Sequence, residues 1–120
     1  NVILDVDTIG AMKIRALCPD ATLVYILPPS WDELKSRLSS TGIYNKEEVN
    51  ALMEIAEEEI SCANSYDYIL VNDTISNTLS RFAQIIHSNR YSRNCMKEFL
   101  DSYIDGEVKP HVQSYKEALL

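Results

Sequence analysis

The sequence predicts an α/β fold with a three-stranded parallel sheet, flanking helices and a helical C-terminal tail. Three observations support this prediction. Short apolar runs alternate with longer segments whose apolar residues recur at helical spacing, as in strands joined by crossover helices. The runs are continuous, which is typical of strands buried on both faces. Turn-forming residues follow the runs, which lie at 2–6, 21–30 and 66–73.

The first two runs are separated by a short helix. Thr8 is expected to cap this helix, which continues to about Leu17 and ends before Pro19. The second strand then stops at Pro28 and Pro29, because proline has no backbone N–H to donate to a sheet ladder.

Two capped helices are predicted between the second and third strands. Ser30 caps the first, with Glu33 at the capping-box position, and this helix reaches about Ser39. After a turn, Asn45 caps the second, again with an acid three residues later at Glu48. The second helix carries one apolar stripe, formed by Val49, Leu52, Met53, Ala56 and Ile60.

Helices also follow the third strand. The first has Ile75, Leu79, Phe82, Ile85 and Ile86 on one face. From Arg90 a tail begins, and its helical stripe consists of Met96, Phe99, Leu100, Tyr103 and Ile104. A last short helix is expected over 112–120.

The overall charge limits the classes of partner. The net charge of −7 opposes nonspecific binding to nucleic acid or to an anionic membrane. No apolar run approaches the length of a bilayer span. Cys18, Cys62 and Cys95 form no C-x-x-C pair, so they are interpreted as small buried hydrophobes in a reducing compartment rather than as metal ligands. These features predict a cytoplasmic protein with no metal site of its own.

The chain begins inside a predicted strand and without an initiating Met. A parallel strand needs neighbours, and a bare edge invites aggregation. We therefore expect the chain to be part of a longer polypeptide.

Polar residues gather at the predicted carboxyl ends of the strands, where open parallel sheets bind ligands. Asp5 interrupts the first run and Asp7 follows it, whereas Asn72 and Asp73 are the last two residues of the third run. Buried carboxylates are costly unless something binds them. The alternative is that Asp7 and Asp73 cap helices, an explanation that does not extend to Asp5 inside its strand.

These motifs, taken in order, resemble the C-terminal half of guanylate kinases. The resemblance covers about 2–86 and consists of the D-x-D strand followed by G-A, the I-L-P-P-S turn, the E-L-x-x-R-L helix and the Y-D-Y-x-x-V-N-D strand. It implies a P-loop kinase fold with a mobile lid, here at about 31–60. The implied reaction transfers the γ-phosphoryl group of ATP to GMP with Mg²⁺.

The resemblance also implies roles for individual residues. Asp5 and Asp7 are placed on the GMP and magnesium side of the cleft, and Asn72, with Asp73 beside it, at the adenine end of ATP. A carboxylate suits guanine, which offers two adjacent N–H donors, and a second carboxylate suits hydrated Mg²⁺. Arg37 is the expected catalytic cation of the lid.

The lid departs from the family pattern. Family lids carry two further arginines, and here Thr41 and Leu52 occupy those positions. Between Ser30 and Ile60 three basic residues stand against eight acidic ones. Phosphoryl transfer depends on cations around the migrating group, so this lid is predicted to be a poor catalyst. The acidic helix is equally well explained as a solvated outer face.

The P-loop is also missing from these residues. The glycines are Gly10, Gly42 and Gly106, and none of them precedes a lysine. The chain as given is therefore expected to be inactive and to hold no cofactor by itself.

Three functional hypotheses follow. The leading hypothesis is a divergent guanylate-kinase-like domain, residues 1–89 with a tail at 90–120, that binds a protein partner as a non-catalytic scaffold. Its Gly42-Ile43-Tyr44 run resembles the altered lid of a member type found with leucine-rich repeats in ciliary or cytoskeletal proteins. The alternative is the C-terminal part of an active guanylate kinase that uses Mg²⁺ with ATP. Binding of GMP or ATP without turnover is a third reading.

Overall fold

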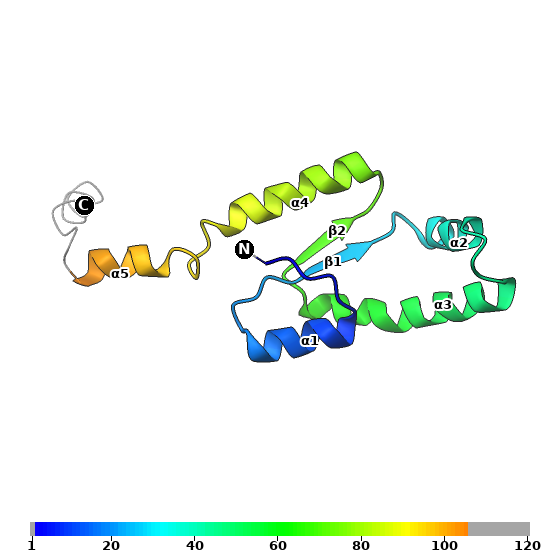
Figure 1. Ribbon diagram of the computed structural model, residues 1–120, viewed down its shortest axis with the longest axis horizontal. Coiled ribbons are helices and arrows are strands. Elements are labelled where there is room, and N and C mark those ends of the chain that lie inside the picture. The colour runs from blue at the N-terminus through cyan, green and yellow to red at the C-terminus, as the bar shows by residue number, and fades with distance from the viewer. Residues whose placement is uncertain (1, 106–120) are drawn as a thin grey trace. The chain divides into compact units, whose positions relative to one another are not determined.

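A computed structural model of the protein describes residues 2–105. The chain divides into two compact units after Phe82. In the first, the elements are α1 (Thr8–Leu17), β1 (Val24–Leu27), α2 (Trp31–Ser40), α3 (Lys46–Glu59), the 3₁₀ helix η1 (Ile60–Ser65) and β2 (Tyr68–Val71), followed by the start of α4 (Ile75–Asn89) (Figure 1). The second unit begins within α4 and contains α5 (Lys97–Asp105).

The sheet consists of two parallel strands in the described residues. Val24 of β1 lies opposite Tyr68 of β2, and Leu27 lies opposite Val71. Parallel pairing requires a long crossover, and α2, α3 and η1 provide it. The predicted strands at 21–30 and 66–73 are therefore confirmed, although both are shorter than expected.

The third predicted strand is not confirmed. Residues 2–6 form no strand in the part of the chain that the structure describes. Val2, Ile3 and Leu4 are 85%, 67% and 60% exposed. An apolar run indicates a tendency to be buried, whereas a strand also needs a neighbour that supplies backbone donors and acceptors. No described segment supplies them here.

Side-chain caps fix the helix starts. Ser30 accepts a hydrogen bond from the Glu33 N–H at the start of α2, as predicted. At the start of α3, Asn45 and Glu48 form a complete capping box. The prediction for α1 was wrong by one residue, because Asp7 rather than Thr8 is the cap and accepts from the Gly10 N–H at 2.7 Å.

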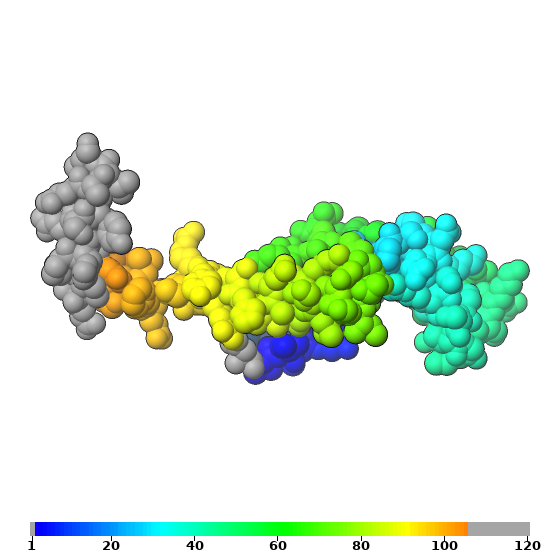
Figure 2. Space-filling view, turned by 90° about the horizontal axis from the view of Figure 1, so that it is seen from above, coloured from blue at the N-terminus to red at the C-terminus, as the bar shows by residue number. Residues whose placement is uncertain are grey.

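The helices α2 and α3 form an arm that extends beyond the carboxyl ends of the two strands (Figure 1). They pack against each other, as their neighbouring cyan and green atoms show in Figure 2. The arm turns at Gly42, whose φ of 69° is the left-handed conformation that follows many helix ends. This arm covers the segment, 31–60, that the resemblance predicts to be a lid, and we call it the lid arm.

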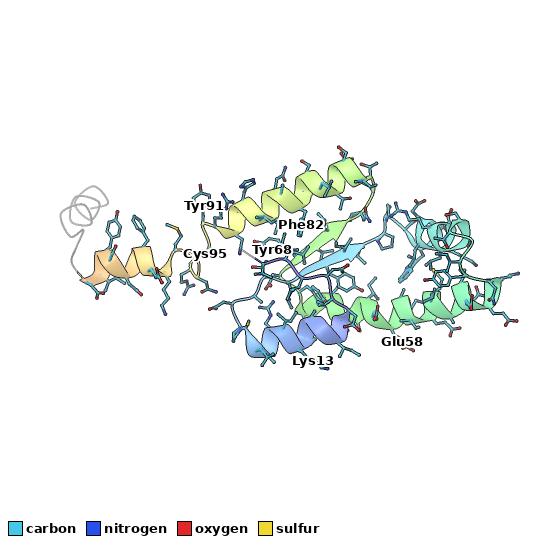
Figure 3. All side chains as sticks on the ribbon, viewed as in Figure 1. Lys13, Glu58, Tyr68, Phe82, Tyr91 and Cys95 are labelled. Carbon is cyan, nitrogen blue, oxygen red and sulfur yellow. The ribbon has the colours of Figure 1, made fainter. Side chains whose placement is uncertain are left out.

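A small set of residues forms the core of the first unit. Asp67, just before β2, accepts hydrogen bonds from the Leu23 N–H and from Arg15 of α1, so one carboxylate joins α1 to the start of both strands. Phe82 points from α4 toward the strands, whereas Glu58 projects from α3 on the opposite side (Figure 3). The buried apolar residues are Ala11, Leu23, Val49, Ala63 and Leu70.

The second unit is helical in its described part. Successive hydrogen-bonded turns follow α4 and lead into α5. The helix predicted for the apolar stripe of the tail is confirmed by α5. Within it, the rings of Phe99 and Tyr103 meet edge to face, with their centres 5.2 Å apart. The short helix predicted over 112–120 lies outside the described residues. Within the described residues no helix has the length and apolar character needed to cross a membrane.

Replacing Gly42 tests the arm's turn. Gly42→Ala is expected to lower the free energy of unfolding by about 1 kcal/mol, because a Cβ disfavours positive φ. No atom lies within 4 Å of the position that the new Cβ would take, so the loss is conformational rather than a clash. Urea unfolding measures it.

Gly42→Asn is the matched variant, since asparagine tolerates this conformation better than alanine. It should lose clearly less stability than Gly42→Ala. Equal losses for the two variants would show that the backbone conformation of Gly42 does not limit stability.

Candidate functional site

The chain turns sharply after β2, and this turn is the centre of the candidate site. Arg37 reaches it from α2. Its Nη1 donates to the carbonyl oxygen of Asn72 at 2.9 Å, and its Nη2 donates to that of Asp73 at 3.1 Å. Its Nε donates to Glu33 Oε1 at 2.8 Å, one helical turn earlier. Arg37 therefore links the lid arm to the end of β2.

A second guanidinium, that of Arg81 in α4, approaches the same turn. Its Nη1 donates to the carbonyl oxygen of Val71 at 3.1 Å. The two terminal nitrogens also pair with the two carboxylate oxygens of Asp73, each at 3.0 Å. Three successive carbonyl groups, from Val71 to Asp73, thus accept from two arginines. We call residues 71–73 the clasped turn.

The carboxylate of Asp73 is engaged by protein donors. Besides Arg81, it accepts from the Thr74 N–H at 2.7 Å and from the Asn77 amide at 3.4 Å. The Thr74 N–H and the Arg81 guanidinium hold the pKa of the Asp73 carboxyl below its ordinary value of 3.8. Asp73 consequently acts within the clasped turn as a fixed anion.

The side chain of Asn72 is half-buried at the clasped turn. Its Oδ1 position lies 2.9 Å from the hydroxyl oxygen of Thr78 in α4. Its backbone N–H donates to the carbonyl oxygen of Leu27 at 2.7 Å, which ties the turn to the end of β1. The structure therefore brings Arg37, Asn72 and Asp73 together at the carboxyl ends of both strands.

The two acids near the start of the chain, Asp5 and Asp7, do not take part in the hydrogen bonds of the clasped turn. Asp7 caps α1, as the alternative interpretation expected, and Gly10 leaves room for it, since a Cβ on Gly10 would come within 2.9 Å of Asp7 Oδ1. Asp5 is exposed. Among the described residues no hydrogen bond or ion pair joins either acid to Arg37, Asn72 or Asp73.

Asp7 instead influences Tyr66, one member of a pair of tyrosines. The rings of Tyr25 and Tyr66 meet edge to face at 4.9 Å. Burial, with a further contribution from the Glu59 carboxylate, raises the pKa of Tyr25. Burial also raises the pKa of Tyr66, where Cys62, Glu59 and Asp7 add smaller effects. Asp7 therefore lies close enough to Tyr66 for its charge to be felt.

Thr41 and Leu52, which stand where the resemblance predicts lid arginines, have local structural roles. The Thr41 hydroxyl donates to the carbonyl oxygen of Leu38 at 2.9 Å and accepts from the Ile43 N–H at 3.3 Å, so it shapes the arm's turn. Leu52 is half-buried on α3. In the described part of the arm, Arg37 is the cation that reaches the carboxyl ends of the strands.

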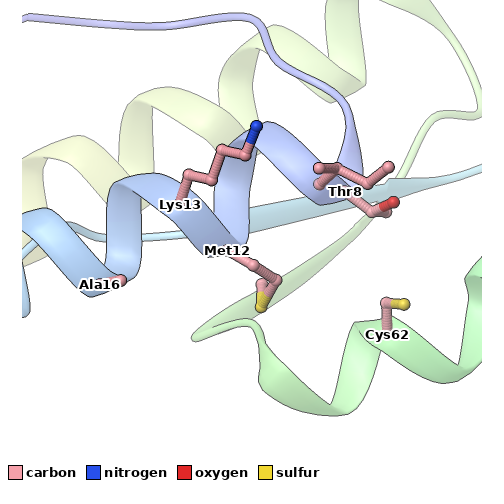
Figure 4. Close-up of a pocket in the computed structure, with 6 residues that line it drawn as sticks. Thr8, Met12, Lys13, Ala16 and Cys62 are labelled. Carbon is pink, nitrogen blue, oxygen red and sulfur yellow. The ribbon is translucent and has the colours of Figure 1, made fainter.

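A separate hollow lies between α1 and η1, where Met12 and Cys62 come from facing elements (Figure 4). Its lining is mainly apolar and offers little to a charged nucleotide. It is formed by Thr8, Ile9, Met12, Lys13, Ala16 and Cys62. The described residues contain no cluster of three His, Cys, Asp or Glu side chains suited to a metal ion.

Sequence reasoning missed Arg81 and Thr78. A local signal for them existed, because both lie in the first two turns of the helix that follows Asn72 and Asp73. The contact between Arg37 and the clasped turn had no such signal, since 35 residues separate Arg37 from Asn72.

Comparisons with a family model and with individual known proteins both identify the same family. The guanylate kinase family matches residues 1–89. A protein named guanylate kinase from Francisella tularensis (strain FSC 198) is 44% identical over 90 residues, which cover 74% of this chain and 47% of that protein. Another from Clostridium acetobutylicum is 34% identical over 116 residues, or 96% of this chain and 54% of that protein. The chain thus spans about half the length of these curated relatives.

Acid titration tests the role of Asp73. Its pKa is lowered in the folded state, so the ionised carboxylate stabilises the fold above its unfolded pKa, and this stability is lost as the pH falls through the lowered folded value. Asp73→Asn should therefore lower the free energy of unfolding at about pH 7 and have much less effect at about pH 3. Urea unfolding at the two pH values measures this difference.

Glu57→Gln, which removes an exposed carboxylate from α3, is the control and should show a smaller dependence on pH. A stability difference between wild type and Asp73→Asn that stays constant from neutral to acid pH would contradict the assigned role.

Proposed function

The chain belongs to the guanylate kinase family, and we propose that the protein carrying it transfers the γ-phosphoryl group of ATP to GMP, giving ADP and GDP. The observation that carries the proposal is the clasped turn, which fixes Asn72 at the carboxyl ends of the strands and ties it to the lid arm through Arg37. A protein named guanylate kinase is 44% identical to this chain over 90 residues.

Arg37 has donors to spare for a phosphate. A guanidinium carries five N–H groups, and the contacts with Glu33, Asn72 and Asp73 use three of them. Under this proposal the remaining two face the nucleotide phosphates, so that Arg37 positions the turn and stabilises charge at the same time.

The proposed roles of the other site residues follow from their chemistry. Asn72 contacts the base of ATP with Asp73 supporting the turn beside it, and Asp5 accepts from the guanine N–H groups. Asp7 is suited to Mg²⁺, because its Oδ1 is used by the Gly10 N–H and Mg²⁺ commonly takes one carboxylate oxygen together with waters and phosphates. When bound, Mg²⁺ would neutralise charge on the ATP phosphates.

The reaction also needs a phosphate-binding glycine-rich loop ending in Gly-Lys-Ser or Gly-Lys-Thr, and these 120 residues contain none. The natural polypeptide that includes this chain must therefore provide that loop for the proposal to hold.

A second function, binding of a protein partner without catalysis, is favoured by the electrostatics of the lid. From Ser30 to Ile60 there are eight acidic and three basic residues, and Arg37 is already bonded to Glu33. An acidic arm closing over a triphosphate adds repulsion where the transition state needs positive charge. This observation supports a scaffold that keeps the kinase fold.

A coupled assay of ADP release separates the two functions. With ATP, Mg²⁺ and GMP, the natural polypeptide is expected to turn over at about 1 s⁻¹ or faster, as kinases do. Omitting GMP gives the background ATP hydrolysis. If ADP release does not rise above this background when GMP is added, the kinase proposal is wrong. Calorimetry with GMP and ATP then shows whether the site still binds nucleotides.

Adding a cation to the lid arm tests whether a shortage of positive charge there limits phosphoryl transfer. Thr41 lies at an arm position where the family pattern has arginine, and it is exposed. A well-placed arginine contributes roughly 10³–10⁵ in phosphoryl transfer, so Thr41→Arg should raise kcat by at least about tenfold even if its placement is imperfect.

Ser40→Arg, which adds the same charge one residue earlier at another exposed position, is the matched control and should raise kcat much less. If neither variant changes kcat, a shortage of lid cations does not limit the reaction.

A further inference from the structure

We propose that Glu59 is a positioning residue for Asp7, because it holds the start of α1 through the hydroxyl group of Thr8. This inference rests on the proposed function, in which Asp7 serves the magnesium side of the cleft. Glu59 is the last residue of α3. The contact therefore gives the lid arm a second attachment, in addition to the one that Arg37 makes from α2.

The contact joins elements that are far apart in the sequence. The Thr8 hydroxyl donates to Glu59 Oε1 at 3.3 Å, across 51 residues of chain. This distance is long for an O–H···O bond, so we expect an effect on position rather than a large one on stability. Asp7, the preceding residue, accepts from the Ala11 N–H through its carbonyl oxygen and from the Gly10 N–H through Oδ1. Because these bonds make Asp7 part of α1, a contact that holds the start of α1 also locates Asp7.

Glu59 differs from the acidic residues that precede it on α3. Glu54, Glu57 and Glu58 are exposed, whereas Glu59 is half-buried. An acid in the last turn of a helix opposes that helix's own dipole, but the start of α1, which Glu59 contacts, carries the opposite partial charge. The interaction with α1 therefore accounts for a carboxylate here better than the stability of α3 does.

The ring of Tyr66 shows that the two carboxylates share one neighbourhood. Burial makes the largest contribution to the raised pKa of Tyr66, and the charges of Glu59 and Asp7 are among the smaller ones. Charge effects weaken with distance, so both acids lie near this ring. Two like charges in a half-buried place need donors, and the Thr8 hydroxyl and the Gly10 N–H supply one to each.

The start of α1 needs a contact of its own, because the helix is otherwise fixed at its far end. There Arg15 pairs with Asp67. Between the two ends, Ala11 is the buried residue of α1, and its small side chain offers little resistance to a pivot. Asp7 lies about 12 Å along the helix from Arg15, so a rotation of about 5° would displace it by about 1 Å. A displacement of that size is costly at a catalytic site.

Residual dipolar couplings, measured by NMR on the nucleotide-free natural polypeptide, test the position of α1. The couplings of the α1 amides, fitted against those of β1 and β2, report the orientation of the helix. Thr8→Val keeps the branched shape but loses the donor, and should change or reduce the α1 couplings. Thr8→Ser keeps the hydroxyl and should retain the wild-type values. Identical couplings in all three proteins would overturn the proposal.

The magnesium requirement of the reaction tests what this position serves. In the coupled assay of ADP release, Thr8→Val and Glu59→Ala should each raise the Mg²⁺ concentration for half-maximal rate by about threefold to tenfold, the value of one hydrogen bond. The kcat at saturating Mg²⁺ should stay nearly unchanged. A role in stability alone would instead lower kcat with the folded fraction and leave the Mg²⁺ requirement as in wild type, and that result would overturn the proposal.

The double variant and a neighbouring control show whether the contact itself is responsible. Because Thr8→Val and Glu59→Ala remove the same contact, combining them should raise the Mg²⁺ requirement no further than either does alone. Glu58→Ala removes a carboxylate that projects to the opposite side (Figure 3) and should leave the requirement unchanged. Effects that multiply in the double variant, or an equal rise in Glu58→Ala, would overturn the proposal. Thermal unfolding shows that each variant is folded.

Failure of the proposed function would be recognised separately. If GMP does not raise ADP release by the wild-type polypeptide, the kinase proposal is contradicted. The dipolar couplings require neither nucleotide binding nor turnover, so they still decide whether the contact between Thr8 and Glu59 positions Asp7.

Discussion

Carbonyl groups that follow the last residue of a strand have left the ladder and need donors of another kind, because an unpaired polar group removed from water is costly. In this chain two guanidinium groups supply them to the clasped turn. Arg37 comes from α2 and Arg81 from α4, so the turn is held by elements on either side of it in the sequence. The position of Asn72, and with it the candidate base site, depends on this arrangement.

These contacts stabilise the fold only modestly, and their main effect is to fix the position of the clasped turn. The side chains of Arg81 and Asp73 are 43% and 33% exposed, and partly exposed ion pairs add little to stability. They do restrict where the turn can lie, since a guanidinium presents its donors in a rigid plane. Arg37 adds a connection to the lid arm, so the position of that arm and the position of Asn72 are physically linked.

Local features of the fold could be predicted from the sequence, while long-range ones could not. Ser30 and Asn45 cap their helices as expected, because a cap needs only residues three positions away. The strand at 2–6 was not found, because strand formation depends on a neighbour as well as on apolar character. Asn72, Asp73 and Arg37 were singled out by motif, yet their contact depends on how α2 meets the end of β2, which no spacing reveals.

The central claim is that the clasped turn is already rigid before any nucleotide binds. Backbone ¹⁵N relaxation of Asn72, Asp73 and Thr74 in the nucleotide-free protein tests it most directly. Order parameters near 0.85, about the value of rigid backbone, are expected at all three amides. Values below about 0.6, typical of flexible segments, would show that the two arginines do not fix the turn, and would contradict the account.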